Sequence, residues 1–328
     1  MARAVEGRGG REPVDVEVYC VAGLSLASAL RLAAPTVREP PDWTVHLGGP
    51  RLSPPGSPGD EVIAELSGRD QVLYRVVSRP GGDLVALVLP GLADFEVDLL
   101  HRVVVAHAHP QGDPGLLPVL VAGTLVALLL SLSGEVVLHA SAVEVAGEAI
   151  AFVGGSGQGK TTVAALCCAA GYPLVADDLL VVRPEEDGSV SCLPGSRELR
   201  LRSGAAPIAD LLAVDGSMRR PTVDARTAVS PQASALGRLP LRAVALPWPQ
   251  HRSGRVELST LGPARATVTL LRAQRIVNWR PRERAGMWIE KMSCIAAAVP
   301  VSSLAVPWGP PWDPALGRLL VSALAGGA

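Results

Sequence analysis

The segment GGSGQGKTT at residues 154–162 constrains the fold of this chain more than any other. It satisfies the pattern GxxxxGK[ST] through Gly154, Gly159, Lys160 and Thr161. The apolar run AIAFV precedes it and the apolar run TVAALCCAA follows it, which is the strand, loop and helix order that the pattern requires. A glycine-rich turn with a chance lysine would lack this context. The sequence therefore predicts a phosphate-binding loop between a buried strand and a helix.

The residue types in this loop suit a nucleoside triphosphate with Mg²⁺. Glycines let successive backbone N–H groups surround phosphate oxygens, and the N-terminus of the following helix adds a favourable field. We expect Lys160 to contact the β- and γ-phosphates and the Thr161 hydroxyl to face Mg²⁺. The predicted cofactors are ATP and Mg²⁺, and the predicted nucleotide contacts are Gly154, Ser156, Gly157, Gln158, Gly159, Lys160, Thr161 and Thr162.

Two adjacent carboxylates, Asp177 and Asp178, end the apolar run YPLVADD shortly after the loop. Neighbouring side chains on a strand alternate between its faces, but at the end of a strand, where the backbone turns, both can reach one site. One carboxylate could then hold Mg²⁺ while the other takes the proton from an attacking hydroxyl. The alternative is that the pair only caps a turn.

Other polar residues are weaker candidates. His139 lies in a strand-like run before the loop, where a lone histidine is more often a hydrogen-bonded structural residue. Glu198 is a candidate second metal ligand, and a solvated strand position fits it equally well. Arg219 and Arg220 could stabilise a transferring phosphate or simply be solvated. Both lie in the polar, turn-rich stretch Val214–Pro240, which we expect to be a mobile loop.

Charge and cysteine content limit the partners and the compartment. The net charge of -1, from 30 basic and 31 acidic residues, gives no bulk attraction to nucleic acid or an anionic membrane. The five cysteines show no CxxC spacing, so we expect reduced thiols in the cytoplasm. The apolar run Leu116–Leu132 is short for a membrane span and contains Pro118, which favours a buried helix that starts near Pro118. The sequence does not indicate an oligomeric state.

The length of 328 residues favours two domains over one. Residues 1–112 carry short β-type runs such as VDVEVYCV and QVLYRVV between Pro/Gly clusters, which predicts a small β-rich or α+β module, a candidate for substrate recognition. The turn-forming segment HPQGDPG at 109–115 marks the boundary. Residues 113–328 then form the α/β domain with the phosphate loop.

The run Leu138–Val182, LHASAVEVAGEAIAFVGGSGQGKTTVAALCCAAGYPLVADDLLVV, resembles the kinase domain of the HPr kinase/phosphorylase family. That family places a histidine, a glycine-rich loop and an aspartate pair in this order at similar spacing. The chain is more similar still to the HPr-kinase-like enzymes of ribosomally made peptides, notably the lasso-peptide kinases that phosphorylate a serine of the precursor. The segments that carry this similarity are LHASAV, LPGSRELRLR, PVSSLAVPW and LGRLLVSAL. The resemblance covers residues 113–328.

The resemblance implies an α/β fold with the mixed sheet of the HPr kinase and phosphoenolpyruvate carboxykinase type. It also implies roles for the matching residues. Asp177 would activate the acceptor hydroxyl, and Asp178 would lie at the metal site. His139 would lie beside the reaction centre, and Glu198 would bind the metal.

The predicted activity is that of an ATP-dependent kinase acting on a serine or threonine hydroxyl of a lasso-type precursor peptide. HPr kinase/phosphorylase follows the loop lysine with a serine and a glutamate, whereas this chain has Thr161 and Thr162. The sequence also contains no convincing copy of that family's later segment, which is linked to HPr docking and dephosphorylation, so neither HPr as acceptor nor the reverse reaction is carried over. Two alternatives stay open. One is a nucleotide-binding regulatory or maturation ATPase without phosphoryl transfer. The other is a kinase of a free small hydroxyl compound such as serine.

Overall fold

The computed structural model describes residues 16–53, 56–212, 219–222, 224–231, 233–235, 237–251 and 254–326. Its first part is one eight-stranded sheet in the order β1-β2-β3-β8-β7-β6-β5-β4. The pairs β2–β3 and β3–β8 are parallel, and the other pairs are antiparallel. The strands are β1 (Glu17–Val21), β2 (Leu24–Ser28), β3 (Trp43–Leu47), β4 (Glu61–Ser67), β5 (Val72–Ser78), β6 (Leu84–Leu89), β7 (Ala93–Asp98) and β8 (Val103–Ala108).

A nine-stranded mixed sheet follows, in the order β12-β10-β11-β18-β14-β13-β9, with β20 beside β18 and β19 beside β20. The central strand β11 is parallel to β18 and antiparallel to β10. The strands are β9 (Val136–Leu138), β10 (Ala140–Val145), β11 (Glu148–Val153), β12 (Leu174–Ala176), β13 (Leu180–Pro184), β14 (Val190–Leu193), β18 (Leu239–Gln250), β19 (Glu257–Thr260) and β20 (Val301–Pro307). The expected α/β fold with a mixed sheet is confirmed at this level, and its more specific type stays a prediction.

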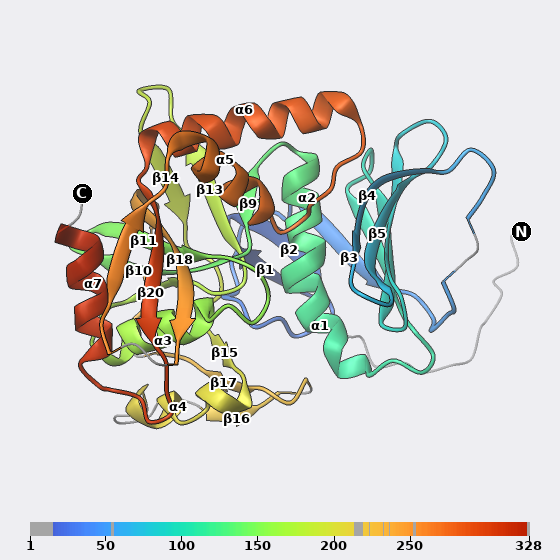
Figure 1. Ribbon diagram of the computed structural model, residues 1–328. Helices are drawn as coiled ribbons and strands as arrows, with labels where there is room; N and C mark the ends of the chain where they lie inside the picture. The colour runs from blue at the N-terminus through green and yellow to red at the C-terminus, as the bar shows by residue number, and fades with distance from the viewer. Residues whose placement is uncertain are drawn as a thin grey trace, which may run out of the picture.

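Helices cover both faces of the nine-stranded sheet (Figure 1). Ile150 and Phe152 of β11 pack with the core of α3, α4 and α7, whereas Ala149 and Ala151 pack in the core that contains α2, α5 and α6. This alternation follows from the two-residue period of a strand. The helices are η1 (Pro114–Leu116), α1 (Leu117–Leu120), η2 (Val121–Leu125), α2 (Val126–Leu132), α3 (Lys160–Ala169), η3 (Ser203–Ala205), α4 (Ile208–Leu212), α5 (Pro263–Arg272), α6 (Arg282–Ala298) and α7 (Leu316–Gly326).

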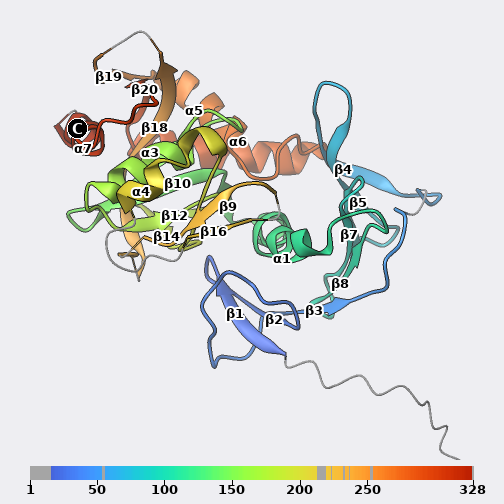
Figure 2. The same ribbon diagram turned by 90° about the horizontal axis from the view of Figure 1, so that it is seen from below.

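The apolar helical segment Pro114–Leu132 lies between the two large sheets (Figures 1 and 2). Among the described residues it is the one helix long and apolar enough to cross a membrane, yet 61% of its most apolar window is buried inside the protein. Leu125, Val126 and Leu128 are fully buried. The predicted buried helix is therefore found, although it starts at Pro114 rather than near Pro118. Its middle turn, η2, is π-helical.

The predicted boundary near residue 112 lies between the end of β8 and the start of η1. The buried side chains do not divide there, because Phe95 of β7, Leu125 of the apolar helix and Trp279 belong to one continuous core. A division into residues 1–112 and 113–328 stays a prediction. In this structure the two sheets share a hydrophobic core.

The expected mobile loop Val214–Pro240 is partly wrong. Residues 214–218, 223, 232 and 236 lie outside the described residues, but β16 (Arg219–Pro221) and β17 (Thr227–Val229) are strands. They form a three-stranded antiparallel sheet with β15 (Leu199–Leu201) in the order β15-β17-β16. Long-range pairing with β15 therefore orders strands in a stretch whose composition is typical of a loop.

Candidate functional site

The glycine-rich loop joins β11 to α3, as its sequence predicts. Gly159 directly precedes α3 and has a φ of +90°, a left-handed conformation that an L side chain rarely adopts. A Cβ at this position would lie 2.2 Å from Cη2 of Trp308. Backbone conformation and the packed indole ring therefore both require glycine here.

Lys160 is buried at the start of α3 and bonds to the loop itself. Its Nζ donates to the carbonyl oxygens of Gly154, at 2.9 Å, and of Gly155, at 3.0 Å. Burial lowers the pKa of Lys160 to about 8, despite the opposing attraction of Asp178 and Asp177. An incoming phosphate group offers this ammonium a stronger acceptor than either carbonyl.

Asp177 directly follows the end of β12 and is buried beside Thr161, at the end of the loop. Its Oδ1 accepts hydrogen bonds from Ser141 Oγ at 2.6 Å and Thr161 Oγ1 at 2.8 Å, and its Oδ2 accepts from the backbone N–H of Arg200 at 3.2 Å. Burial raises the pKa of Asp177, and the neighbouring charge of Asp178 acts in the same direction. Both carboxylate oxygens thus already have partners within the protein.

Asp178 has a φ of +70°, so its backbone leaves the strand conformation. Its side chain therefore has different partners from the side chain of Asp177. Its Oδ1 lies 3.0 Å from His139 Nδ1, and its Oδ2 lies 3.4 Å from Arg275 Nη2. His139 Nδ1 is also 3.1 Å from the Asp178 carbonyl oxygen. Burial alone would raise the pKa of Asp178, but the charges of Arg275 and His139 outweigh it and hold this pKa well below its usual range.

The two aspartates therefore face two different groups of residues. Asp177 contacts the loop residue Thr161, whereas Asp178 contacts His139 and has a side chain that is 45% exposed. A left-handed residue that is not glycine costs roughly 1–3 kcal/mol, and such residues are enriched at functional sites. The structure brings together the loop, His139 and both aspartates.

The donor set that fits a magnesium ion best consists of Thr161 Oγ1 and Asp177 Oδ1. These oxygens are 2.8 Å apart. Neighbouring ligands around octahedral Mg²⁺, each about 2.1 Å from the ion, are separated by about 3 Å. Among the described residues, no three His, Cys, Asp or Glu side chains are grouped as metal ligands, so a magnesium ion here would take its remaining ligands from phosphate and water.

Glu198 lies next to this group but its carboxylate is occupied. Both of its oxygens accept from Arg220 Nη2, at 3.0 and 2.8 Å, and its side chain is 14% exposed. Arg219 is paired with Asp210 instead. Arg219 and Arg220 therefore have protein partners in this structure, and a metal role for Glu198 stays a prediction.

Sequence reasoning missed several residues of the site. Ser141 and Arg275 reach the aspartates from distant parts of the chain, and no local pattern marks them. Arg202 Nη2 donates to Ser156 Oγ of the loop at 2.9 Å. The sequence did hold a signal for Arg202. In the run LRLR at 199–202, apolar and charged residues alternate as in a strand with one buried face, and the structure indeed buries Leu199 and Leu201.

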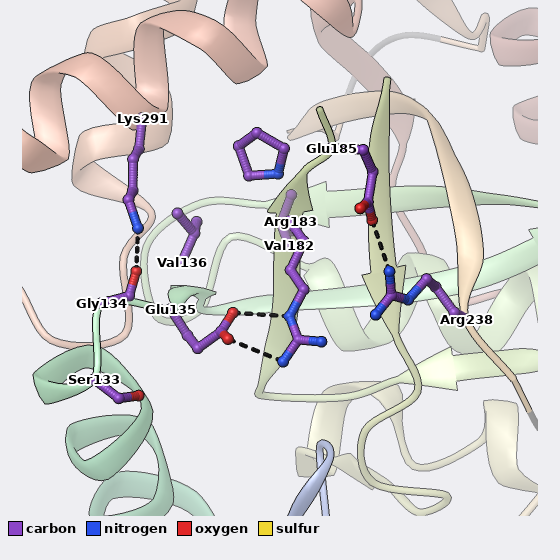
Figure 3. Close-up of a pocket in the computed structure, with 10 residues that line it drawn as sticks. Ser133, Gly134, Glu135, Val136, Val182, Arg183, Glu185, Arg238 and Lys291 are labelled. Carbon is purple, nitrogen blue, oxygen red and sulfur yellow. Dashed lines mark hydrogen bonds and ion pairs between the residues drawn. The ribbon is translucent and has the colours of Figure 1, made fainter. Parts of the chain in front are cut away.

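A cavity of about 340 Å³ lies where β9 begins and β13 ends, and Figure 3 shows the residues that line it. Arg183 donates twice to Glu135, at 2.9 Å each, and Lys291 donates to the backbone carbonyl of Gly134. Arg238 is likewise paired with Glu185. Each of these cations already has an acceptor, so we do not assign phosphate binding to this cavity.

Comparison with known proteins gives similarities to solved structures only. No family model matches this chain, and no curated protein sequence matches it. Among solved structures, the chain is similar to the Hpr(Ser) kinase/phosphatase from Coxiella burnetii, at 10% sequence identity and a TM-score of 0.28. The similarity covers 58% of this chain and 94% of that one. A TM-score this low carries no functional inference, so we take the function from the residues of the site.

Proposed function

We propose that this protein is an ATP-dependent kinase that transfers the γ-phosphoryl group to a serine or threonine hydroxyl of a peptide. The observation that carries the proposal is that two adjacent aspartates face different partners, with Asp177 bonded to Thr161 of the glycine-rich loop and the partly exposed Asp178 paired with His139. A phosphate loop alone is shared by switches, motors and transporters. A second carboxylate, beside the loop and open to solvent, adds a base for an acceptor hydroxyl.

In this proposal the loop and its metal ligands hold the triphosphate. Backbone N–H groups of residues 154–162 and the ammonium of Lys160 bind phosphate oxygens. Thr161 and Asp177 would hold Mg²⁺, which would supply positive charge to neutralise the phosphates during transfer. Arg202, next to Ser156, adds a further cation at the loop.

The acceptor hydroxyl is best served by Asp178. The resemblance implies the reverse assignment, with Asp177 as the base, but Asp177 is buried, whereas the Asp178 side chain is 45% exposed and can meet an incoming hydroxyl, which favours Asp178. The acceptor oxygen bonds to the γ-phosphorus while the bond from phosphorus to the β,γ-bridging oxygen breaks, and that electron pair leaves with ADP. The hydroxyl proton passes to Asp178. A carboxylate of low pKa orients the hydroxyl and takes the proton late, which suits a loose transition state.

A peptide acceptor of the lasso-precursor type is proposed from the resemblance of residues 113–328. The test is to incubate the protein with ATP and Mg²⁺ and three kinds of acceptor: peptides with an internal serine, peptides with a C-terminal serine, and free serine. Mass spectrometry should detect one added phosphoryl group on a peptide. Release of ADP without a modified acceptor would instead support the regulatory ATPase, and transfer to free serine alone would support a small-molecule kinase.

A further inference from the structure

Arg275 reaches the site from the segment between α5 and α6, and its backbone is fixed to β9. The N–H of His139 donates to the carbonyl oxygen of Ala273 at 2.7 Å, and the N–H of Arg275 donates to the carbonyl oxygen of Val137 at 2.9 Å. These two hydrogen bonds attach the backbone on both sides of Gln274 to the strand that leads to His139. The guanidinium of Arg275 is therefore directed toward the aspartates by paired backbone.

The guanidinium has more donors than it uses. Its Nη2 donates to Thr124 Oγ1 at 3.0 Å and lies 3.4 Å from Asp178 Oδ2. Its Nε is buried and has no hydrogen-bond partner among the described residues. An arginine offers five N–H groups, and a buried donor without an acceptor costs about 1–3 kcal/mol. The charge of Arg275 also contributes to lowering the pKa of Lys160, so both cations act on the same region.

We propose that Arg275 binds the γ-phosphoryl group during its transfer and that the N-terminal sheet holds this arginine in position. The proposal rests on the proposed phosphoryl transfer. Charge spreads over the equatorial oxygens of the phosphorus in the transition state, and an arginine fork matches two of them. Arg275 donates hydrogen bonds and keeps its protons, so it is separate from the base.

The N-terminal sheet holds the four residues that follow Ile276. The N–H of Val277 donates to the hydroxyl oxygen of the buried Tyr74 at 2.7 Å. The N–H of Arg280 donates to the carbonyl oxygen of Ile63 at 2.9 Å, and Trp279 forms an antiparallel bridge with Ala64. Residues 277–280 are thereby attached to β5 through Tyr74 and to the edge strand β4 through an isolated bridge.

Through this connection the N-terminal sheet would position Arg275 for phosphoryl transfer. Tyr74 bonds to a backbone group two residues after Arg275, so it acts on the site through the arginine and is a positioning residue. A shift of about 1 Å in such a support can lower a rate about 100-fold. The hydroxyl of Tyr74 on β5 holds the backbone of Val277, which lies two residues after Arg275, and Arg275 in turn contacts Asp178.

The test measures the binding of ADP, Mg²⁺ and aluminium fluoride, which together mimic the transition state of phosphoryl transfer. This complex forms without an acceptor. Arg275→Gln should keep its affinity for MgADP within about threefold and lose at least about 100-fold in aluminium fluoride binding and in transfer. Guanidinium chloride at non-denaturing concentration should partly restore transfer in Arg275→Ala. The control is Arg183→Ala, which removes an arginine paired with Glu135. This variant should keep aluminium fluoride binding, and its transfer rate should not change with guanidinium chloride. An equal loss of MgADP affinity in Arg275→Gln would overturn the proposal.

The positioning role is tested with Tyr74→Phe, which removes one hydroxyl from a buried ring. We expect about a tenfold fall in kcat at unchanged KM for ATP, and no further fall when Tyr74→Phe is added to Arg275→Ala. Additive losses would show that Tyr74 acts independently of Arg275 and would overturn this part. If the wild-type protein forms the aluminium fluoride complex but phosphorylates no acceptor, the kinase proposal fails, and loss of that complex in Arg275→Gln would still support the role of Arg275.

Discussion

The side chains around Asp177 and Asp178 separate two tasks that one carboxylate cannot perform together. Asp177→Asn should weaken Mg²⁺-dependent binding of ATP at least about tenfold, because it removes the carboxylate that faces Thr161. Asp178→Asn should leave that affinity almost unchanged and lower transfer about 100-fold or more, because it removes the proposed base. Calorimetry with and without Mg²⁺, together with transfer rates, measures both effects. If Asp177→Asn keeps MgATP affinity and loses transfer, the assignment implied by the family resemblance is the correct one.

The buried ammonium of Lys160 should couple nucleotide binding to pH. Its pKa of about 8 lies below the ordinary 10.5, so between these values the unfolded chain carries a proton that the folded protein lacks, and the free energy of unfolding rises with pH. Bound phosphates favour the charged form. MgADP binding at pH values above about 8 should therefore take up a proton, and the affinity should fall by up to about tenfold per pH unit.

Calorimetry at a pH just above the pKa of Lys160, in two buffers of different ionisation enthalpy, measures this proton uptake directly. Lys160→Arg is the control, because an arginine stays charged at these pH values and should abolish the uptake. Identical binding enthalpies for the wild-type protein in both buffers would contradict the linkage.

Local sequence marked some residues of the site and not others for a physical reason. The loop residues and the aspartate pair stand out because glycine conformation and strand ends are local properties. Ser141 and Arg275 contribute through strand pairing and a chain crossing that bring together residues 36 and 97 positions apart from their aspartate partners. Such contacts leave no periodic signal in one sequence.

Helix α3 has a left-handed glycine at each end, but only one of them is packed against a ring. Gly171→Ala, at a φ of +97° with open space around it, should cost about 1–2 kcal/mol and leave MgADP affinity unchanged. Gly159→Ala adds a Cβ 2.2 Å from the Trp308 ring and should lower MgADP affinity at least about tenfold, because the loop must move.

The packing explanation can be tested on its own by adding Trp308→Ala to Gly159→Ala. Removing the ring should recover part of the MgADP affinity and leave only the loss that comes from backbone strain. No recovery would mean that the conformation of Gly159 alone decides the fit. Thermal unfolding of each variant shows whether a change in MgADP affinity is accompanied by a change in the stability of the fold.

Elements with a strong local pattern were predictable, and elements made by distant pairing were not. The hairpin between β10 and β11 follows from two β-type runs around a short turn, and both Ala146 and Gly147 have the positive φ that such a turn requires. By contrast, β16 and β17 are three residues each and depend on β15 and on ion pairs such as Arg200 with Asp224 at 2.7 Å. Composition therefore described them as a loop.

At the scale of the whole molecule, the shared core predicts that the two large sheets unfold together. Phe95 and Leu87 of the N-terminal sheet lie in the same hydrophobic cluster as Leu125 and Trp279. Composition indicated two modules because the strand-rich and helix-rich parts are separate along the chain. It does not show that the apolar helix Pro114–Leu132 packs its buried side chains into a core that both parts share.

Two leucines of β6 test this cooperativity. Leu87→Ala removes a fully buried side chain and should lower the free energy of unfolding by about 2–5 kcal/mol, whereas Leu84→Ala, at a position 49% exposed, should change it by less than about 0.5 kcal/mol.

Thermal unfolding can be followed by far-UV circular dichroism, which reports on the whole chain, and by tryptophan fluorescence. Five of the six tryptophans lie after residue 240, so fluorescence reports mainly on the C-terminal part. Both signals should shift together in Leu87→Ala, because the apolar helix and residues 277–280 transmit the loss of packing. A fluorescence transition that stays at the wild-type temperature would show that the C-terminal part unfolds independently.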